Sequence, residues 1–258
     1  MAARLRDVVS FLDDTLDIGA FRDYGPNGLQ VEGRAEVQRV VTGVSACARL
    51  FDEAARRDAD LVVVHHGLIW GAGLRALTGT LARRLKRLFD REMSLAAYHL
   101  PLDEHERLGN NAGLCDAIGL TAQRDRFGDV RGRALAVAGS FDEPLSRAQA
   151  LDRIAAGVLG GEPPPFVFPH GPETVRRVGV CTGAASDLLE SAREAGCDLY
   201  LTGELAERAG ELARELDITL VAAGHYATEV FGPQRLAAEL SKTFPQLAVQ
   251  FVGVPSPL

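Results

Sequence analysis

Five side chains of metal-binding type stand next to apolar, strand-like segments of the sequence. His65 and His66 end the run LVVVHH, Asp103 follows the run LAAYHLPLD, and His225 and Glu229 follow ITLVAAG. In open α/β sheets, ligands bind outside the carboxyl ends of the strands, where side chains no longer alternate strictly between two faces. These five residues are therefore the candidate ligands of divalent metal ions.

The adjacent pair His65 and His66 is the most informative feature. The strand-like run breaks at Gly67, so the two imidazoles can reach two different ions a few ångströms apart. Taken alone, such a pair also fits ordinary buried or surface histidines. The other segments are needed to favour a metal site.

The spacing of His225 and Glu229 places both side chains on one face of a helix that begins after Gly224. Asp103 follows Pro101, which ends strand pairing and holds the loop at the same sheet edge. The alternative for Asp103 is a capping role for a helix near residues 106–118, because Asp is favoured before a helix start.

The candidate set contains three imidazoles, two carboxylates and no thiolate. This mixture suits zinc, manganese or iron and favours open, water-bearing coordination over a closed structural zinc site. A carboxylate such as Glu229 can bridge two ions. A water held between them would lose a proton near neutral pH and become a nucleophile.

The elements that must position these residues alternate between β-branched runs and amphipathic stretches, the pattern of an α/β protein with open sheets flanked by helices. We predict strands at residues 37–45, 60–65, 95–99, 133–139, 177–181, 198–202, 218–222 and 248–254. We predict helices at residues 3–15, 47–58, 79–91, 145–158, 184–195, 204–216 and 227–242.

Two α/β domains are expected from the length of 258 residues. The polar run at residues 123–133 suggests a border that gives domains 1–125 and 126–258, with the last strand free to return to the first domain. The proline-rich segment 160–172 predicts an extended loop. Both halves have similar βαβ content, which leaves a duplicated architecture open.

Composition excludes several classes of protein. No apolar run approaches the roughly 20 residues of a membrane span, and the N-terminal residues lack the apolar core of a secretory signal, so we expect a cytoplasmic protein. Four separated cysteines predict reduced thiols. The net charge of −7 disfavours nucleic-acid binding, and the basic segment 81–91 fits an amphipathic helix whose apolar stripe includes Phe89.

Five strings resemble one family in order along most of the chain. They are DYGPNGLQVEG (23–33), HHGLIW (65–70), HLPLDEHERLGNN (99–111), YLTGELAE (200–207) and AAGHYATEVFG (222–232). Together they closely resemble the Nif-three-like dinuclear metal-centre proteins, whose members are often labelled GTP cyclohydrolase 1 type 2 homologs. The chain matches the short form of that family.

The resemblance implies roles for individual residues. His65 and His225 would bind one ion, His66 and Asp103 the other, and Glu229 would bridge both. His99 and Glu204 fall on motif positions and are assigned to proton transfer on the substrate side or to the support of the ligands. The motif residues Asn27, Gly28, Gln30 and Glu32 are expected near the site or an interface. Family members resemble toroidal hexamers, so the same assembly is expected.

The sequence therefore favours a metal-dependent hydrolase acting on a nucleotide such as GTP, with two divalent ions per chain. Two alternatives remain open: a non-catalytic metal-holding ring that binds a partner, and a ring that handles DNA or another polyanion.

Two further residues carry expectations. Trp70 is expected to pack beside the site, with base stacking left open, and Ser45 is predicted to cap a helix.

Overall fold

A computed structural model describes residues 2–71, 73 and 76–256 and divides the chain into two compact units. Unit 1 comprises residues 1–102 and 232–254, and unit 2 comprises residues 103–231 with the last residues of the chain. The chain therefore leaves unit 1 and returns to it. The expected border near residue 125 lies instead inside a strand of unit 2.

Unit 1 is built on a sheet that is mostly parallel. Within the described residues its strand order is β13 (Ala248–Phe251), β4 (Arg39–Ser45), β5 (Leu61–His66), β6 (Ser94–Ala97) and β2 (Gly28–Val31). Neighbouring strands are parallel except β2, which runs antiparallel to β6. A short ladder pairs β1 (Ala3–Arg4) with β3 (Glu36–Val37). The carboxyl ends of β4, β5 and β6 thus share one edge.

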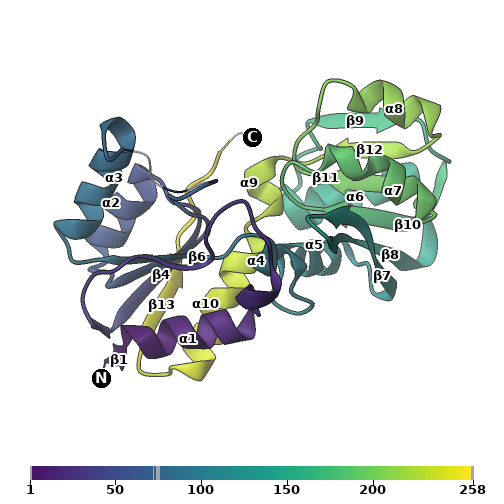
Figure 1. Cartoon of the computed structure of the whole chain (residues 1–258). Helices are drawn as coiled ribbons and strands as arrows, with labels where there is room; N and C mark the ends of the chain where they lie inside the picture. The colour runs from purple at the N-terminus through teal and green to yellow at the C-terminus, as the bar shows by residue number, and fades with distance from the viewer. Residues whose placement is uncertain (1, 72, 74–75, 257–258) are drawn as a thin grey trace. The chain divides into compact units, whose positions relative to one another are not determined.

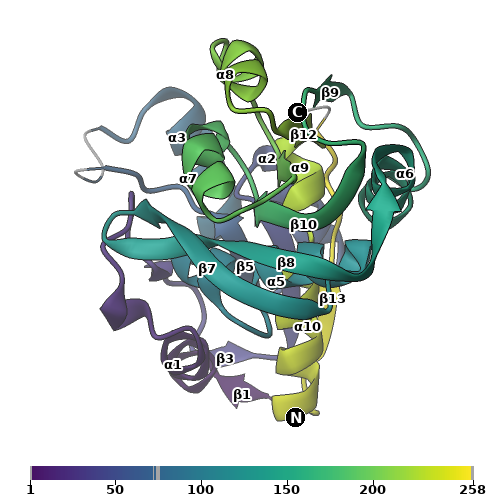
Figure 2. The same cartoon turned by 90° about the vertical axis from the view of Figure 1, so that its right-hand side faces the viewer.

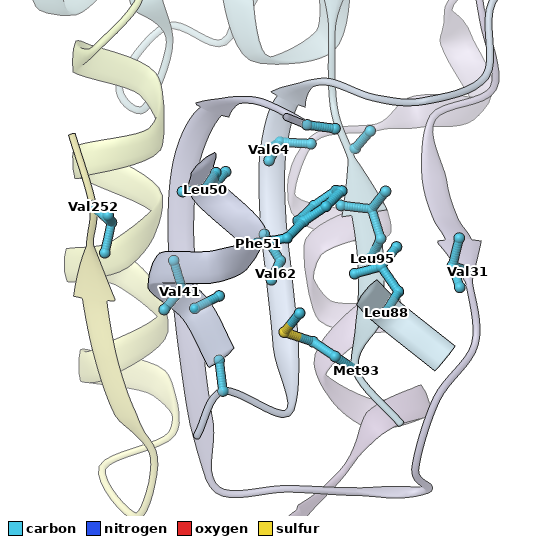
Figure 3. Packing of buried hydrophobic residues seen from close by; sticks show 14 of the residues in the cluster. Val31, Val41, Leu50, Phe51, Val62, Val64, Leu88, Met93, Leu95 and Val252 are labelled. Carbon is cyan, nitrogen blue, oxygen red and sulfur yellow. The ribbon is translucent and has the colours of Figure 1, made fainter. Parts of the chain in front are cut away.

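Helices cover both faces of this sheet (Figure 1). One face carries α2 (Ala48–Arg56) and α3 (Gly79–Phe89), and the other carries α1 (Leu5–Thr15) and α10 (Phe231–Thr243). The core between the sheet and α2 and α3 is apolar, with Phe51 packed among Val62, Leu88 and Leu95 (Figure 3). The chain also forms the short helices η1 (Ile18–Ala20) and α4 (Leu100–Glu104).

Unit 2 is built on a mixed sheet. Its order is β7 (Ala122–Val130), β8 (Arg133–Ser146), β10 (Thr174–Cys181), β11 (Leu199–Thr202), β12 (Thr219–Ala222) and β9 (Phe166–Pro169). The central strands β10, β11 and β12 are parallel, and the others pair antiparallel. Figure 2 looks onto the long β7–β8 hairpin. The parallel strands again bring three carboxyl ends to one edge.

One helix of unit 2 precedes its first strand, and the others follow strands. The helices are α5 (Asn110–Ile118), α6 (Arg147–Val158), η2 (Ser186–Leu188), α7 (Leu189–Glu194), α8 (Ala209–Glu215) and α9 (His225–Thr228). Helices α5 and α6 bury Leu114, Ile118 and Ile154 against alternate residues of the central strands. A capping box between Ser146 and Gln149 fixes the start of α6.

The two units share one βαβ motif down to its hydrogen bonds. In unit 1, Asp60 precedes β5, and its Oδ2 accepts the backbone N–H groups of Gln38 and Arg39 at 2.8 and 3.0 Å. In unit 2, Asp198 precedes β11, and its Oδ2 accepts those of Arg176 and Arg177 at 2.8 and 3.0 Å. Each aspartate therefore ties the start of its strand to the start of the neighbouring parallel strand.

The expected α/β class is confirmed, and three local predictions are corrected. The polar run at 123–133 is not a domain border, because it forms most of β7, the hairpin turn and the first residue of β8. The segment 160–172 is not wholly loop, because Phe166–Pro169 pairs with β12. Phe89 is 58% exposed rather than part of the buried stripe of α3, where Leu85 and Leu88 are buried.

Two observations bear on the composition arguments. Within the described part of the chain, no helix combines the length and apolar character that a membrane crossing needs. All four cysteines are free thiols, with Cys47 half-buried and Cys115, Cys181 and Cys197 buried.

Candidate metal centre

Three histidines of unit 1 converge at the shared carboxyl edge of its parallel strands. His65 and His66 end β5, and His99 lies just beyond β6. One ring nitrogen from each of the three falls within 4.8 Å of the others. His65 is fully buried, and the other two are half-buried. Such a cluster of imidazoles is the donor type that zinc, iron and related divalent ions prefer.

Each imidazole of this cluster is held through its Nδ1 atom. His65 Nδ1 lies 3.0 Å from the carbonyl oxygen of Tyr98, and His99 Nδ1 lies 2.7 Å from Asp23 Oδ1. Both partners only accept, so Nδ1 carries the proton and the lone pair of the neutral ring is on Nε2. His66 Nδ1 lies 3.1 Å from Ser45 Oγ, which can donate or accept. The rings are thereby oriented as metal ligands usually are.

The loop at residues 23–27 supports His99 from several directions. The Asp23 carboxylate, 1% exposed, accepts the backbone N–H of Leu100 at 2.9 Å as well as His99 Nδ1. Asn27 Oδ1 accepts the backbone N–H of His99 at 2.8 Å. Burial raises the pKa of Asp23, but the hydrogen bond and charge of His99 and the bonds from Asn27 and Tyr24 lower it below its usual value. Asp23 therefore stays a carboxylate.

Gln30 fixes the turn that follows the histidine pair. Its Oε1 accepts the backbone N–H groups of Leu68 and Ile69 at 2.8 and 3.3 Å. A Cβ at Gly67 would collide with the Gln30 amide and lie 2.7 Å from Ala97 Cβ. A glycine is needed at position 67 because two other elements pack against the backbone there.

In unit 2, His225 stands between two carboxylates. Its Nδ1 lies 2.7 Å from Glu204 Oε1, and its Nε2 lies 3.1 Å from Glu229 Oε1. His225 begins α9 directly after β12, and Glu204 follows β11, so both residues occupy the carboxyl edge of the parallel strands. The Glu204 contact holds the ring through Nδ1, as in the histidines of unit 1.

The two carboxylates control the protonation of His225. Burial lowers the pKa of the ring, but the hydrogen bonds and charges of Glu229 and Glu204 outweigh burial and raise the pKa from 6.5 to about 9. A divalent cation would take the place of this proton between Nε2 and the Glu229 carboxylate.

Asp103 belongs to unit 2 by its contacts. Its Oδ1 accepts hydrogen bonds from Asn110 Nδ2 at 2.9 Å and Thr182 Oγ1 at 3.2 Å. Carboxylate oxygens of Asp103 and Glu229 lie within 4.8 Å of each other, and the residues are 6% and 3% exposed. Two buried carboxylates at this distance repel each other unless a proton or a cation lies near them. Asp103 does not cap the following helix, because Gly109 precedes α5.

Gly183 leaves room for the Glu229 carboxylate. Its φ angle is +69°, and a Cβ at this position would collide with Glu229 Oε1 and lie 3.2 Å from His225 Nε2. The Gly183 carbonyl also accepts the backbone N–H groups of Gly203 and Glu204, both at 2.9 Å. The loop after β10 therefore leaves space for the Glu229 carboxylate at Gly183 and contacts Asp103 through the Thr182 hydroxyl.

The structure thus gathers the candidate residues within each unit: His65, His66 and His99 in unit 1, and Asp103, Glu204, His225 and Glu229 in unit 2. Sequence reasoning missed Asp23 as the partner of His99, although it opens the string DYGPNGLQVEG. It also assigned Ser45 to a helix cap, whereas α2 starts after Cys47 and Ser45 contacts His66.

The residues fit divalent metal ions. The donors are imidazole nitrogens, with the tautomer fixed for His65 and His99, and buried carboxylates whose negative charge a cation would neutralise. Within the described residues no cysteine belongs to any candidate group, so the chemistry is that of an open nitrogen and oxygen site.

The two α/β units, with histidines and carboxylates gathered at their strand ends, place this chain among α/β proteins with candidate metal centres. Comparison with known proteins places it more closely. The chain belongs to the family described as Duf34/NIF3 (NGG1p interacting factor 3), whose family model matches residues 3–257.

Relatives with curated names cover the whole chain. A protein of Pseudomonas aeruginosa named GTP cyclohydrolase 1 type 2 homolog is 40% identical over 257 residues, which cover 100% of both chains. A protein of Escherichia coli K12 with the same name is 38% identical over 251 residues, covering 97% of this chain and 98% of the relative.

Solved structures share the fold. The structure described as protein ybgI of unknown function has a TM-score of 0.90 at 36% identity and covers 99% of this chain and 100% of its own. The protein TTHA1606 from Thermus thermophilus has a TM-score of 0.88 at 34% identity, with the same coverage.

Proposed function

We propose that this protein is a metal-dependent hydrolase that acts on a nucleotide such as GTP, in the cytoplasm, with two divalent ions per chain. One observation carries the proposal: His65 and His225 each donate Nδ1–H to a fixed acceptor, Tyr98 O and Glu204, so their Nε2 atoms are oriented to ligate. The name shared by the curated relatives supports the choice of GTP.

The ligands of the two units are proposed to form one dinuclear centre. The assignment gives His65 and His225 to one ion, His66 and Asp103 to the other, and Glu229 to both. Connectivity supports it, because the chain passes between the units after Leu102 and after Phe231. Asp103 and Glu229 stand beside these two passages. Positions 99 and 103 are four steps apart along the chain, a separation that spans at most about 14 Å.

Bound divalent ions would supply Lewis acidity and an activated water at neutral pH. The protein's own groups then handle binding and protons. The Glu204 side chain is 43% exposed while it holds His225, so its carboxylate can exchange protons with solvent or substrate. His99 is oriented by Asp23, and its Nε2 is placed to accept or donate a proton on the substrate side.

Metal content tests the first part of this proposal. Protein purified without chelator should carry about two equivalents of zinc, iron or manganese per chain, measured by inductively coupled plasma mass spectrometry. His66→Ala and His225→Ala should each lower that content. His170→Ala is the matched control, because His170 lies in the loop after β9 outside every candidate group. Metal content near zero in the unaltered protein would remove the basis of the proposal.

Turnover tests the second part. Metal-loaded protein should consume GTP faster than the chelated protein, with chromatography distinguishing ring opening from phosphate release. Two bound metal ions without turnover on GTP or related phosphate esters would instead support a metal-holding protein that binds a partner.

A toroidal hexamer is proposed on the resemblance to the family. Native mass spectrometry of the purified protein should give six chains per particle, and a monomer at micromolar concentration would contradict it.

A further inference from the structure

Trp70 is anchored at its polar edge while much of its ring is open to solvent. Its Nε1–H donates to the carbonyl oxygen of Gly67 at 3.0 Å, which fixes the ring close to the turn after the histidine pair. The residue is nevertheless 42% exposed. An oriented indole that remains in water is a preformed contact surface, because the hydrogen bond already restricts its rotamer before a ligand binds.

The Trp70 ring lies beside two histidines of the candidate metal centre. Its centroid is 5.1 Å from that of His99, edge to face at 86°, and 6.0 Å from that of His66. A second exposed ring, Tyr24, has its centroid 5.9 Å from His99, and Tyr24 is 47% exposed. Two large aromatic side chains are therefore exposed next to the same imidazole.

The backbone holds the two aromatic residues together. The N–H of Gly71 donates to the carbonyl oxygen of Tyr24 at 2.6 Å. A Cβ on Gly25 would collide with Ile69 O and lie 3.4 Å from Trp70 Cα, so the loops at 23–27 and 67–71 can approach this closely only with glycine there. Both loops also orient histidines, through Asp23 and through Gly67 after His66. The exposed rings are thus fixed to the same supports as the candidate ligands.

We propose that Trp70, together with Tyr24, is a stacking surface for a planar heteroaromatic ring of the substrate, a nucleobase, held next to His66 and His99. The inference rests on the proposed function and deepens it. Recognition of the base would come from the aromatic faces in unit 1, whereas any phosphate groups would be recognised by the cations. A substrate with a phosphate chain and no base would then lack the contact with the aromatic rings.

Trp70 is the single tryptophan of the chain, so its fluorescence reports on this surface directly. Metal-loaded protein is titrated with guanosine, adenosine, cytidine, uridine, GTP and inorganic triphosphate. Free N-acetyltryptophanamide, titrated in the same way, corrects for light absorbed by the added compound. Guanosine and GTP should quench the fluorescence saturably, and inorganic triphosphate should leave it unchanged. Equal changes with triphosphate, or no change with guanosine, adenosine, cytidine or uridine, would overturn the inference.

Substitutions separate stacking from a structural effect of the ring. Base–aromatic stacking predicts that Trp70→Ala weakens guanosine binding by roughly 5- to 150-fold in calorimetry. Trp70→Phe, which keeps a ring but loses the hydrogen bond to Gly67, should retain most of the affinity. Affinity for inorganic triphosphate and the metal content should be unchanged in both variants. Guanosine affinity unchanged in Trp70→Ala, or lost equally in Trp70→Phe, contradicts stacking.

Phe89→Ala is the matched control. Phe89 is also exposed, but it ends α3 shortly before β6 begins, and the candidate histidines lie at the other ends of the strands. It should bind guanosine like the unaltered protein. The two levels of inference fail separately. If the protein binds two metal ions but no base changes the Trp70 fluorescence, only the stacking surface is contradicted. If bases quench the fluorescence but GTP is not turned over, only the hydrolase is contradicted.

Discussion

A hydrogen bond on Nδ1 orients each histidine of the candidate metal centre. A carbonyl oxygen holds His65, and carboxylates hold His99 and His225. A carboxylate partner also raises the basicity of the far nitrogen, which strengthens its bond to a cation. Glu204 was expected from its motif to support the ligands or to transfer protons, but Asp23 was not, because it lies 76 residues from His99 along the chain.

Replacing Glu204 with Gln should weaken metal binding while leaving the fold intact. The amide can still accept the Nδ1–H of His225, but its charge is lost, and changes to such supporting groups typically cost about 10- to 100-fold in metal affinity. Competition with a chromophoric chelator would measure the change. Glu215→Gln is the control, because Glu215 is an exposed residue at the end of α8. Equal metal affinity for Glu204→Gln and the unaltered protein would contradict a supporting role.

The repeated βαβ motif is the element on which the candidate ligand groups of each unit are built. Arg39, Asp58 and Asp60 of unit 1 correspond to Arg177, Gly196 and Asp198 of unit 2 at the same spacing. Asp58 and Gly196 both adopt a positive φ, at 51° and 76°, in the turn before the second strand. At the end of that strand the motif places His66 in unit 1 and Glu204 in unit 2. The sequence left duplication open because few side chains are identical.

Asp60→Ala and Asp198→Ala should each destabilise the protein. Each substitution removes a carboxylate that accepts two backbone N–H groups, and hydrogen bonds to charged groups contribute about 1.5–3 kcal/mol. Asp60 also contacts Arg34 at 3.1 Å. Chemical denaturation followed by circular dichroism would show the loss as a lower midpoint. Asp152→Ala, within the exposed face of α6, provides the control. Midpoints unchanged in both variants would show that these bonds are not needed.

Most central strands and long helices were predictable because their apolar periodicity is strong. Strands β4, β5, β10, β11 and β12 lie close to their predicted positions. The missed strands are edge strands. In β7, Phe127 is buried among polar neighbours, so the run looks like a domain border, and β9 ends in a proline, which edge strands tolerate. Polarity and proline therefore misled the prediction where one side of a strand is not paired.

The path of the whole chain was the hardest property to predict. Local patterns indicate elements, but they do not show that the chain leaves unit 1 after Leu102 and returns at Gly232. The last strand, which the sequence left free to return to the first domain, pairs with β4, and Thr42 Oγ1 donates to the Pro233 carbonyl at 2.8 Å. Long-range contacts of this kind decide which residues form one unit.

Metal binding should stabilise the whole molecule through ligands from both units. A ligand that binds only the folded protein at 100 times its Kd contributes about 2.7 kcal/mol, which shifts the melting temperature upward. Differential scanning fluorimetry of chelated protein with and without added zinc would show this shift. His66→Ala in unit 1 and His225→Ala in unit 2 should each abolish most of it, while His170→Ala keeps it. If either substitution left the full shift in place, that unit would not contribute to the centre, and the assignment of one dinuclear site to both units would be wrong.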